Sequence, residues 1–299
     1  MKILFILFSI SILANSCNRE LDKEIIKETL ASKNSSDQKI VSSYLFSKNL
    51  NRKWNYIIYL PPNYQKDTLN KYRILYLLHG HGGNHETWMG SGEIKSMLDE
   101  LIISNKINPF IIVMPDGVNS WFVDGTEKME SAIIYDLLPF IEKKYRIKTD
   151  WEATSIGGMS AGGYGSLRLI LKYPDTFSNA ILMSPASYFP FPDQTSYSRS
   201  EVSSFKDSKG VFSTKKWTSY NYPNYWNTFD QSIHHSHHIF LSVGSSDGYT
   251  GIIKAVNEQL PKEFTKRDVK FEVQNYEGGH EMNVWKQAFK KAILTIYKK

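Results

Sequence analysis

Short, almost continuous apolar runs alternate along the chain with longer stretches in which apolar residues recur at helical spacing. Beyond the first seventy residues, the apolar runs predict strands at 73–78, 110–114, 180–183 and 239–243, and less apolar strands are predicted just before Ser160 and at 270–276. Runs of this kind are typical of parallel strands that are covered on both faces. The helical spacing predicts helices at 91–104, 127–145, directly after Ser160, 250–264 and 282–297. The alternation predicts an α/β fold: a mostly parallel sheet with helices on both faces.

Two further strands are predicted near the start of this pattern. Residues 42–47 and 53–60 have strand composition, and the polar residues 49–52 between them predict a turn. We therefore expect a hairpin, which Pro61-Pro62 ends.

The alternation breaks down between Ser184 and His237, where an insertion rich in aromatic residues is expected. Aromatic faces over a site could stack on sugar rings or on a phenolic acyl group. An insertion of this length also needs a small core of its own, so both roles stay open. The aromatic residues are Tyr188, Phe189, Phe191, Tyr197, Phe205, Phe212, Trp217, Tyr220, Tyr222, Tyr225, Trp226 and Phe229.

The segment Thr154–Gly165 predicts a strand, a tight turn and a helix, with Ser160 on the turn. Gly158-Met159-Ser160-Ala161-Gly162 fits the G-x-S-x-G pattern of a nucleophile elbow. Strand and helix backbones pass closely at such a turn, so the positions two before and two after the serine must be nearly bare. Gly158 and Gly162 meet that requirement.

Three side chains are predicted to act together because each follows a predicted strand. Ser160, Asp247 and His280 occur in the order Ser…Asp…His that is expected of α/β-hydrolases. A serine nucleophile needs a base to take its proton, and the base needs a carboxylate to fix its tautomer. Two other acids could take the place of Asp247. Asp193 follows an earlier strand and remains a lesser alternative, whereas Glu277 belongs to the same turn as His280 and would struggle to approach the imidazole from behind.

Two other acidic residues follow the strand at 110–114. Asp116 and Asp124 are expected to shape the pocket or to cap a turn. Asp124 and Glu127 have the spacing of a capping box at the start of the next helix.

An oxyanion hole needs two backbone donors. The first is expected to be the amide of Ala161, directly after the serine. The second is expected in the glycine-rich loop His79–Asn84, where we choose the amide of His81 over its ring.

The remaining histidines predict no metal site, and no cofactor is expected. His79 is expected to pack beneath the site, and His85 to be a solvated loop residue. Four histidines crowd one loop without thiol or acidic partners, so we expect incidental surface residues there: His234, His235, His237 and His238.

Composition limits the partners. A chain of 299 residues with 41% hydrophobic residues is globular, and it is long enough for a large core. The net charge of +6 is distributed among acidic residues, which argues against nucleic-acid binding. The lysines of the C-terminal helix are expected to form a solvated face.

The N-terminus predicts export. Residues 1–16 combine one early lysine with a short apolar run that ends in small residues, which is typical of a signal peptide. Cys17, the sole cysteine, follows directly and resembles a lipoprotein processing site. We expect a lipid-anchored tether over 17–40, an α/β-hydrolase domain over 41–299 and a place in the cell envelope. The rival interpretation is an ordinary signal peptide that leaves a free thiol.

These motifs together resemble the esterase D-like branch of the α/β-hydrolases, which includes feruloyl esterases, acetyl esterases, S-formylglutathione hydrolases and mycolyltransferases. The resemblance implies that Ser160, Asp247 and His280 are the triad, and that His81 and Ala161 form the oxyanion hole. The exported feruloyl-esterase-like members are nearest, because the S-formylglutathione hydrolases are cytosolic. The motifs that carry it are Tyr76–Gly83 with Trp88, Met114–Gly117, Gly158–Gly163, Gly244 with Asp247, and Gly279-His280 with Trp285.

The expected function is hydrolysis of acyl esters on carbohydrate through an acyl-enzyme on Ser160. Transfer of the acyl group to a sugar hydroxyl would use the same residues. A glycan-binding protein on a retired hydrolase scaffold is the alternative of another class, and an intact triad argues against it.

Overall fold

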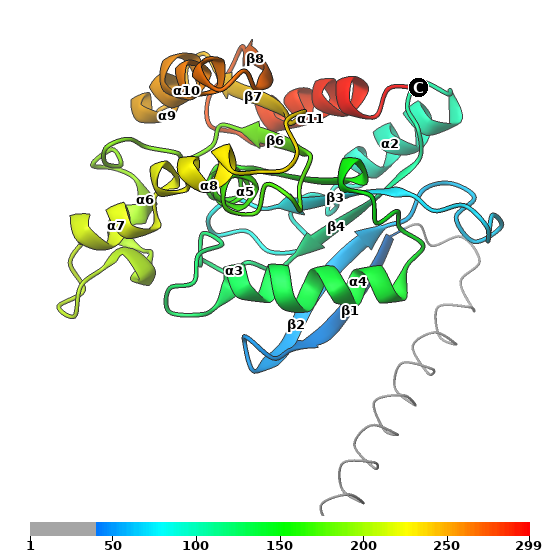
Figure 1. Cartoon of the computed structure of the whole chain (residues 1–299), viewed down its shortest axis with the longest axis horizontal. Coiled ribbons are helices and arrows are strands. Elements are labelled where there is room, and N and C mark those ends of the chain that lie inside the picture. Colours follow the sequence, from blue (N-terminus) through cyan, green and yellow to red (C-terminus); the bar gives the residue numbers. More distant parts are fainter. Residues whose placement is uncertain (1–39) are drawn as a thin grey trace, which may run out of the picture. The chain divides into compact units, whose positions relative to one another are not determined.

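The computed structural model describes residues 40–299, which contain one eight-stranded sheet in the order β1-β2-β4-β3-β5-β6-β7-β8 (Figure 1). β1 pairs antiparallel with β2, and β2 with β4, so the predicted hairpin is confirmed. All other neighbours are parallel. The strands are β1 Ile40–Ser47, β2 Arg52–Tyr59, β3 Arg73–Leu78, β4 Phe110–Pro115, β5 Thr154–Met159, β6 Asn179–Met183, β7 His238–Gly244 and β8 Lys270–Tyr276.

The register brings the carboxyl ends of the parallel strands to one edge of the sheet. Leu78 at the end of β3 pairs with Gly158 near the end of β5, and Met159 pairs with Met183. On the other side, Gly244 at the end of β7 pairs with Tyr276 at the end of β8. The loops that follow these strands therefore meet at this edge.

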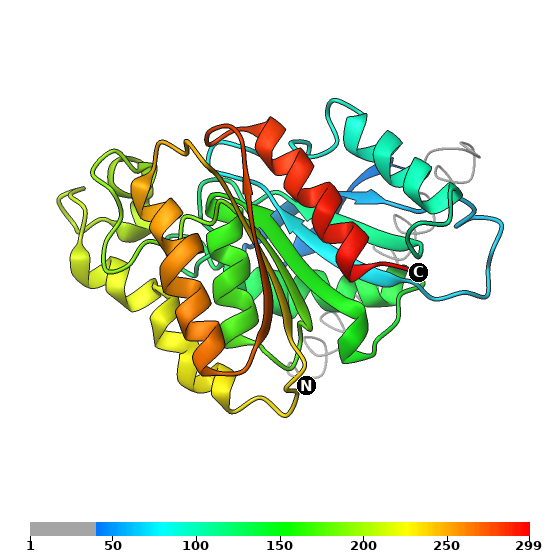
Figure 2. The same ribbon diagram turned by 90° about the horizontal axis from the view of Figure 1, so that it is seen from above.

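Helices cover both faces of the sheet, as predicted. α2 and α11 pack on one face, and Figure 2 shows them lying across the same side of the strands. α3, α4, α5, α8, α9 and α10 pack on the other face. Side chains within one strand alternate between the two cores: Ile74 and Tyr76 face the second, Leu75 and Leu77 the first. The helices are α2 Glu93–Ile103, α3 Met129–Ala132, α4 Leu138–Lys144, α5 Ala161–Lys172, α9 Thr250–Lys254, α10 Leu260–Lys266 and α11 Met282–Ile296.

Two predicted helices contain a π-helical turn that the sequence analysis did not anticipate. Ile133–Leu137 is π-helical between α3 and α4, and Ala255–Gln259 between α9 and α10. In each case a proline, Pro139 or Pro261, follows the π turn by two residues. A proline inside a helix lacks an N–H donor, and its ring crowds the carbonyl four residues earlier, so a locally wider helix accommodates it.

The capping box predicted at Asp124 and Glu127 is wrong. Asp124 instead accepts hydrogen bonds from the amide and the hydroxyl of Ser131, the third residue of α3. Glu127 pairs with Arg52, at 3.0 Å. Because the helix begins at Met129, Glu127 lies before it and cannot occupy the third helical position.

The insertion at 184–237 forms short helices at one end of the sheet (left in Figure 1). Its α-helices are α6 Tyr197–Ser200, α7 Thr214–Tyr220 and α8 Trp226–Asp230. The buried guanidinium of Arg168 on α5 joins it to the main body, donating to the carbonyl of Tyr220 and the hydroxyl of Tyr225. Within residues 40–299, no helix is both long and apolar enough to cross a lipid bilayer.

Candidate active site

Ser160 lies on the turn between β5 and α5 in an unusual backbone conformation. Its φ is 53° and its ψ is −116°. A residue with a β-carbon rarely adopts a positive φ, so this turn stores strain. The turn directs the serine side chain out of the sheet, where its Oγ can meet groups from other strand ends.

Glycine is required two residues before and two residues after Ser160 for the steric reason that the sequence predicts. A β-carbon on Gly158 would lie 2.5 Å from the carbonyl carbon of Gly162. A β-carbon on Gly162 would lie 2.5 Å from the carbonyl oxygens of Leu78 and His79. These contacts involve backbone atoms that cannot move aside, so the crossing of β5, β3 and α5 requires glycine at both positions.

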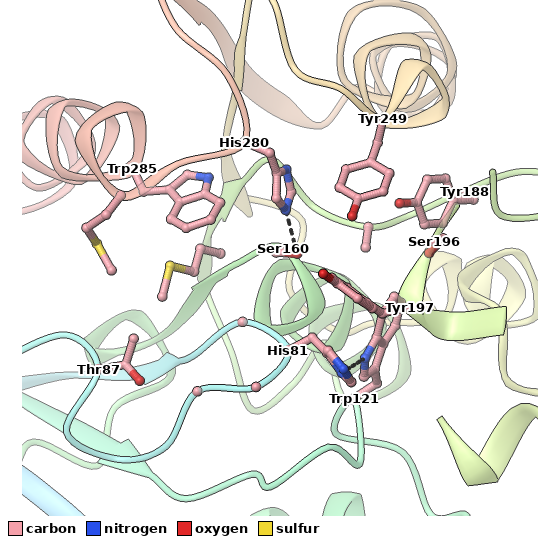
Figure 3. A pocket seen from close by; sticks show the side chains of 16 residues that line it. His81, Thr87, Trp121, Ser160, Tyr188, Ser196, Tyr197, Tyr249, His280 and Trp285 are labelled. Atoms are coloured by element: carbon pink, nitrogen blue, oxygen red, sulfur yellow. Dashed lines mark hydrogen bonds between the residues drawn. The ribbon is translucent and has the colours of Figure 1, made fainter. Parts of the chain in front are cut away.

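An unbroken hydrogen-bond chain links three strand ends (Figure 3 shows its first link). His280 Nε2 lies 2.8 Å from Ser160 Oγ, and His280 Nδ1 lies 2.8 Å from Asp247 Oδ2. The Asp247 side chain is fully buried, while 18% of the His280 side chain is exposed. The carboxylate is thereby shielded from water, and the imidazole stays open to a ligand.

Gly244 allows the His280 loop to approach the Asp247 loop. A β-carbon on Gly244 would lie 2.5 Å from the carbonyl oxygens of Gly278 and Gly279. The other carboxylate oxygen, Asp247 Oδ1, accepts from the amide of Tyr249 at 3.0 Å. The Asp247 side chain is therefore held in one orientation toward His280.

The rival acids have other partners. Asp193 accepts a hydrogen bond from the amide of Gly251 at 3.0 Å, at the start of α9. Glu277 is exposed. Asp116 lies 3.7 Å from the imidazole of His85. The partner of His280 Nδ1 is the carboxylate of Asp247.

The loop after β3 lies against the serine. A β-carbon on Gly80 would be 3.5 Å from Ser160 Cβ. Among the described residues, neither the amide of His81 nor that of Ala161 donates a hydrogen bond to another group. Ala161 begins α5, so its amide is one of the unpaired donors at a helix N-terminus.

His79 fixes the start of this loop, in the buried place that the sequence predicted. Its Nδ1 donates to the carbonyl of Gly80 at 2.7 Å, and its Nε2 accepts from the amide of Gly117 at 2.8 Å. Burial lowers the pKa of His79 below its usual value. The neutral ring therefore acts as a fixed structural bridge between the β3 and β4 loops.

A cleft of about 370 Å³ opens above Ser160 and His280 (Figure 3). Strand ends, the loops that follow them and the first turn of α11 form one wall, which we call the sheet wall: Gly80–Gly83, Met159, Ser160, His280 and Trp285. Residues of the insertion form a second wall, the insertion wall: Ala186, Tyr188, Ser196 and Tyr197. Thr87, Trp121, Tyr249 and Met282 complete the lining.

Comparison with known proteins now assigns this arrangement to a family. A family model for esterases, named Esterase, matches residues 47–296, which include all strand-end loops described above. The chain belongs to the Esterase family. A solved ferulic acid esterase shares the fold with a TM-score of 0.71 and 24% sequence identity, over 87% of this chain and 97% of the other. The α/β-hydrolase fold expected from the sequence is thus confirmed.

Two curated relatives resemble part of the chain. The endo-1,4-beta-xylanase/feruloyl esterase of Xylanibacter ruminicola is 34% identical over 142 residues, which cover 44% of this chain and 20% of the relative. The acetyl esterase of Caldicellulosiruptor saccharolyticus is 32% identical over 156 residues, which cover 49% of this chain and 56% of the relative. Both matches span less than two thirds of the relative's length.

The aromatic residues of the insertion in this esterase-family chain divide between the two roles left open above. Tyr188 and Tyr197 line the cleft, and Tyr188 also belongs to the main core. A larger group is buried in the main core: Phe205, Trp217, Tyr222, Trp226 and Phe229. Phe189 and Phe191 are exposed. Most of these rings therefore stabilise the insertion, and a minority can contact a ligand.

Two predictions about histidines are wrong. His85 is not solvated, because 13% of its side chain is exposed and it lies beside Asp116. Of the four histidines at 234–238, His237 and His238 are buried, and burial lowers the pKa of each. The sequence placed all four in a loop, but His238 begins β7. Within residues 40–299, no group of three His, Cys, Asp or Glu side chains could hold a metal ion.

Trp121, which lines the cleft, and Glu201, which lies behind its lining, were not predicted from the sequence. Trp121 lies in the loop after β4, so its position after a parallel strand was a usable signal. Glu201 directly follows α6 and lies 2.9 Å from the ring of His81. The sequence around Glu201 carries no pattern that indicates its contact with His81, because the two residues lie 120 positions apart in the chain.

Proposed function

We propose that this chain is a serine carboxylic-ester hydrolase that removes acyl groups from carbohydrate. The observation that carries the proposal is the Ser160–His280–Asp247 hydrogen-bond chain, with both links at 2.8 Å. The relatives that bear the names feruloyl esterase and acetyl esterase support the substrate class.

Each residue of the chain has one role in the first half of the reaction. His280 Nε2 takes the hydroxyl proton as Ser160 Oγ attacks the ester carbonyl carbon, and Asp247 stabilises the imidazolium that forms. The negative charge moves to the carbonyl oxygen, where the amides of Ala161 and His81 stabilise it. His280 then gives its proton to the departing sugar oxygen as the ester C–O bond breaks.

The second half uses the same groups with water in place of the sugar. His280 takes a proton from water, which attacks the acyl-enzyme carbonyl. Collapse of the tetrahedral intermediate breaks the bond to Ser160 Oγ, which takes its proton back from His280. The products are a free carboxylic acid and the original serine.

The direct test is turnover of p-nitrophenyl acetate by the wild-type chain and by Ser160→Ala. Loss of the nucleophile should lower kcat by about 10⁶, as triad removals do. Ser166 belongs to α5, which follows Ser160 directly, and donates to the carbonyl of Gly162; Ser166→Ala is the matched control and should retain activity. Full activity in a folded Ser160→Ala protein would refute the serine mechanism.

A separate experiment measures whether the enzyme prefers feruloyl or acetyl esters. We propose that the aromatic lining of the cleft accepts a hydroxycinnamoyl group as well as an acetyl group. Parallel kcat/KM values for methyl ferulate and for acetylated xylooligosaccharides would rank them. Release of free acid, followed by chromatography, would distinguish hydrolysis from acyl transfer to an added sugar.

We further propose that the chain is exported and that Cys17 is lipidated. Cys17 lies outside the part of the chain that the structure describes. The proposal assigns 1–16 to a signal peptide, 17–40 to a tether and 41–299 to the esterase domain. A lipoprotein carries several acyl chains, and each buried methylene adds about 0.8 kcal/mol to membrane binding. Fractionation of the native host should find the wild type in membranes, and Cys17→Ala unprocessed or released. A wholly soluble wild type with an unmodified Cys17 would contradict the anchor.

A further inference from the structure

The loop Gly80–Gly83 has a single side chain by which it can be held. Three of its four residues are glycines, and the fourth is His81. Gly82 has a φ of 72°, and a β-carbon there would meet nothing within 4 Å. Its amide donates to Asn119 Oδ1 at 2.9 Å. Apart from such backbone contacts, the position of this loop depends on the imidazole of His81.

Three aromatic or acidic side chains hold that imidazole. Trp121 Nε1 donates to His81 Nδ1 at 3.2 Å, and His81 Nε2 lies 2.9 Å from Glu201 Oε2. The ring of Tyr197 stacks on the imidazole, with centroids 4.9 Å apart and planes at 18° (Figure 3). As a result, only 8% of the His81 side chain is exposed.

The hydrogen bonds fix the tautomer of His81. An indole N–H can only donate, so Nδ1 of His81 must be the acceptor. The neutral ring then has its hydrogen on Nε2, which donates to the Glu201 carboxylate. A hydrogen bond to an ionised acceptor is stronger than a neutral one, so Glu201 is the stronger of the two polar contacts.

Trp121 itself is held rigidly. Its side chain is 3% exposed and lies edge-on to Tyr164, Phe205 and Trp217. Its φ of 54° is in the left-handed region, which a bulky residue occupies only when its surroundings enforce it. The indole donor is therefore fixed before His81 meets it.

We propose that Glu201 and Tyr197 are positioning residues through which the insertion holds the amide of His81 in place for the oxyanion. Both belong to α6 or directly follow it, whereas His81 belongs to the loop after β3. The inference rests on the proposed function, because it assumes that the His81 amide receives the oxyanion. It assigns the insertion a part in the chemical step as well as in substrate contact.

The effect of losing this contact should appear in kcat. The amide is most valuable when the carbonyl oxygen acquires full charge, and loss of one oxyanion donor costs about 10²–10³ in kcat. A loosened donor should cost less than a missing one. Glu201 does not line the cleft, so binding of the ground-state substrate should change little.

The experiment compares Glu201→Ala, Glu201→Gln and Glu258→Ala on p-nitrophenyl acetate. Glu201→Ala should lower kcat by about 10- to 100-fold with KM within about threefold of wild type. Glu201→Gln keeps an oxygen that can accept from Nε2 and should recover kcat to within about fivefold of wild type. Glu258, an exposed glutamate of the π turn before α10, is the matched control and should match wild type. Half of the Glu201 side chain is exposed (51%), so the variants should fold.

Labelling with a fluorophosphonate separates this inference from the proposed function. Ser160 Oγ displaces fluoride from the reagent and keeps a tetrahedral phosphonyl group whatever the natural ester, so the labelling rate reports the triad and the oxyanion donors without an ester substrate. Glu201→Ala should slow labelling of Ser160 as much as it lowers kcat. A wild type that is labelled at Ser160 but hydrolyses no ester would refute the proposed function and leave this comparison intact.

Three results would overturn the inference. The first is a Glu201→Ala protein with wild-type kcat and labelling rate. The second is a loss confined to KM, which would make Glu201 a substrate-binding residue. The third is additive losses in the Glu201→Ala and His81→Ala double mutant, because residues that act through one contact should be strongly non-additive.

Discussion

The sheet wall and the insertion wall of the cleft differ in how they are held. Side chains of the sheet wall leave the ends of paired parallel strands, and backbone crossings at Gly158, Gly162 and Gly244 set their spacing. The insertion wall is built from loops and short helices that pack through aromatic rings. The sheet wall thus has little freedom, whereas the insertion wall can change in shape and sequence.

This difference assigns different tasks to the two walls. Chemistry needs groups held to within about half an ångström, which the strand ends provide. Selection among acyl groups tolerates a softer surface, which exposed side chains such as Tyr197 provide. The two walls meet where the ring of Tyr197 stacks on His81, and Glu201, directly after α6, holds the same imidazole.

The largest effect should come from Asp247, which orients His280 of the sheet wall from behind. Asp247→Asn should lower kcat by about 10⁴ for every ester, because the amide favours the wrong tautomer of His280. Asp193→Asn is the matched control: its amide oxygen can still accept from Gly251, and activity should stay within about threefold of wild type. A mild Asp247→Asn with a damaging Asp193→Asn would reverse the assignment of the acid.

A smaller effect is expected where the insertion joins the body. Glu130 is buried and pairs with the buried Arg168 at 2.8 Å and with Lys172. Glu130→Gln would leave Arg168 without its counter-charge and should lower the free energy of unfolding by about 3–5 kcal/mol. Chemical denaturation at pH 7 would measure it, and a loss below 1 kcal/mol would contradict the role of this pair.

The same pair predicts a pH dependence. Burial alone would raise the pKa of Glu130, but Arg168 and Lys172 outweigh it and hold the pKa below its usual value of 4.5. A lowered folded pKa contributes stability above the unfolded pKa, and this is lost as the pH falls through the folded value. Stability should therefore fall below about pH 4.5, and less steeply in Glu130→Gln. Equal slopes in both proteins would exclude Glu130 as the cause.

The smallest effect should come from the insertion wall. Tyr188 lines the cleft beyond Tyr249 in the view of Figure 3. Tyr188→Phe removes one hydroxyl and should raise KM for methyl ferulate about fivefold, the equivalent of about 1 kcal/mol, by removing a partner for the phenolic end. KM for p-nitrophenyl acetate should not change, since an acetyl group is too short to extend beyond Ser160. Equal changes for both esters would show that the walls do not divide the work in this way.

The same difference explains what could be predicted from sequence. Strands such as β3 and β8 carry their signal in consecutive residues, and the elbow carries its own in the spacing of Gly158, Ser160 and Gly162. The strand ends then bring His280 and Asp247 beside Ser160 by topology alone.

Contacts within the insertion had no such signal. Nothing local distinguishes Tyr197, which faces the cleft, from Trp217, which is buried. The pairing of His81 with Glu201 depends on tertiary packing, as does the burial of His237. Pro139 and Pro261 indicate the π turns in the sequence, but a prediction from helical periodicity alone does not take prolines into account.

The crossing of backbones at Gly158 and Gly162 has a consequence for mutational scanning. Scored by hydrolysis, a library of single substitutions would place both glycines beside Ser160 among the least tolerant positions. Scored by protein abundance, Ser160 would accept alanine or glycine, because its hydroxyl makes no contact that the fold requires, whereas β-branched residues would be disfavoured at its positive φ. The glycines would stay intolerant, since any β-carbon would lie 2.5 Å from backbone atoms. Two such screens would separate chemistry from architecture without knowledge of the natural substrate.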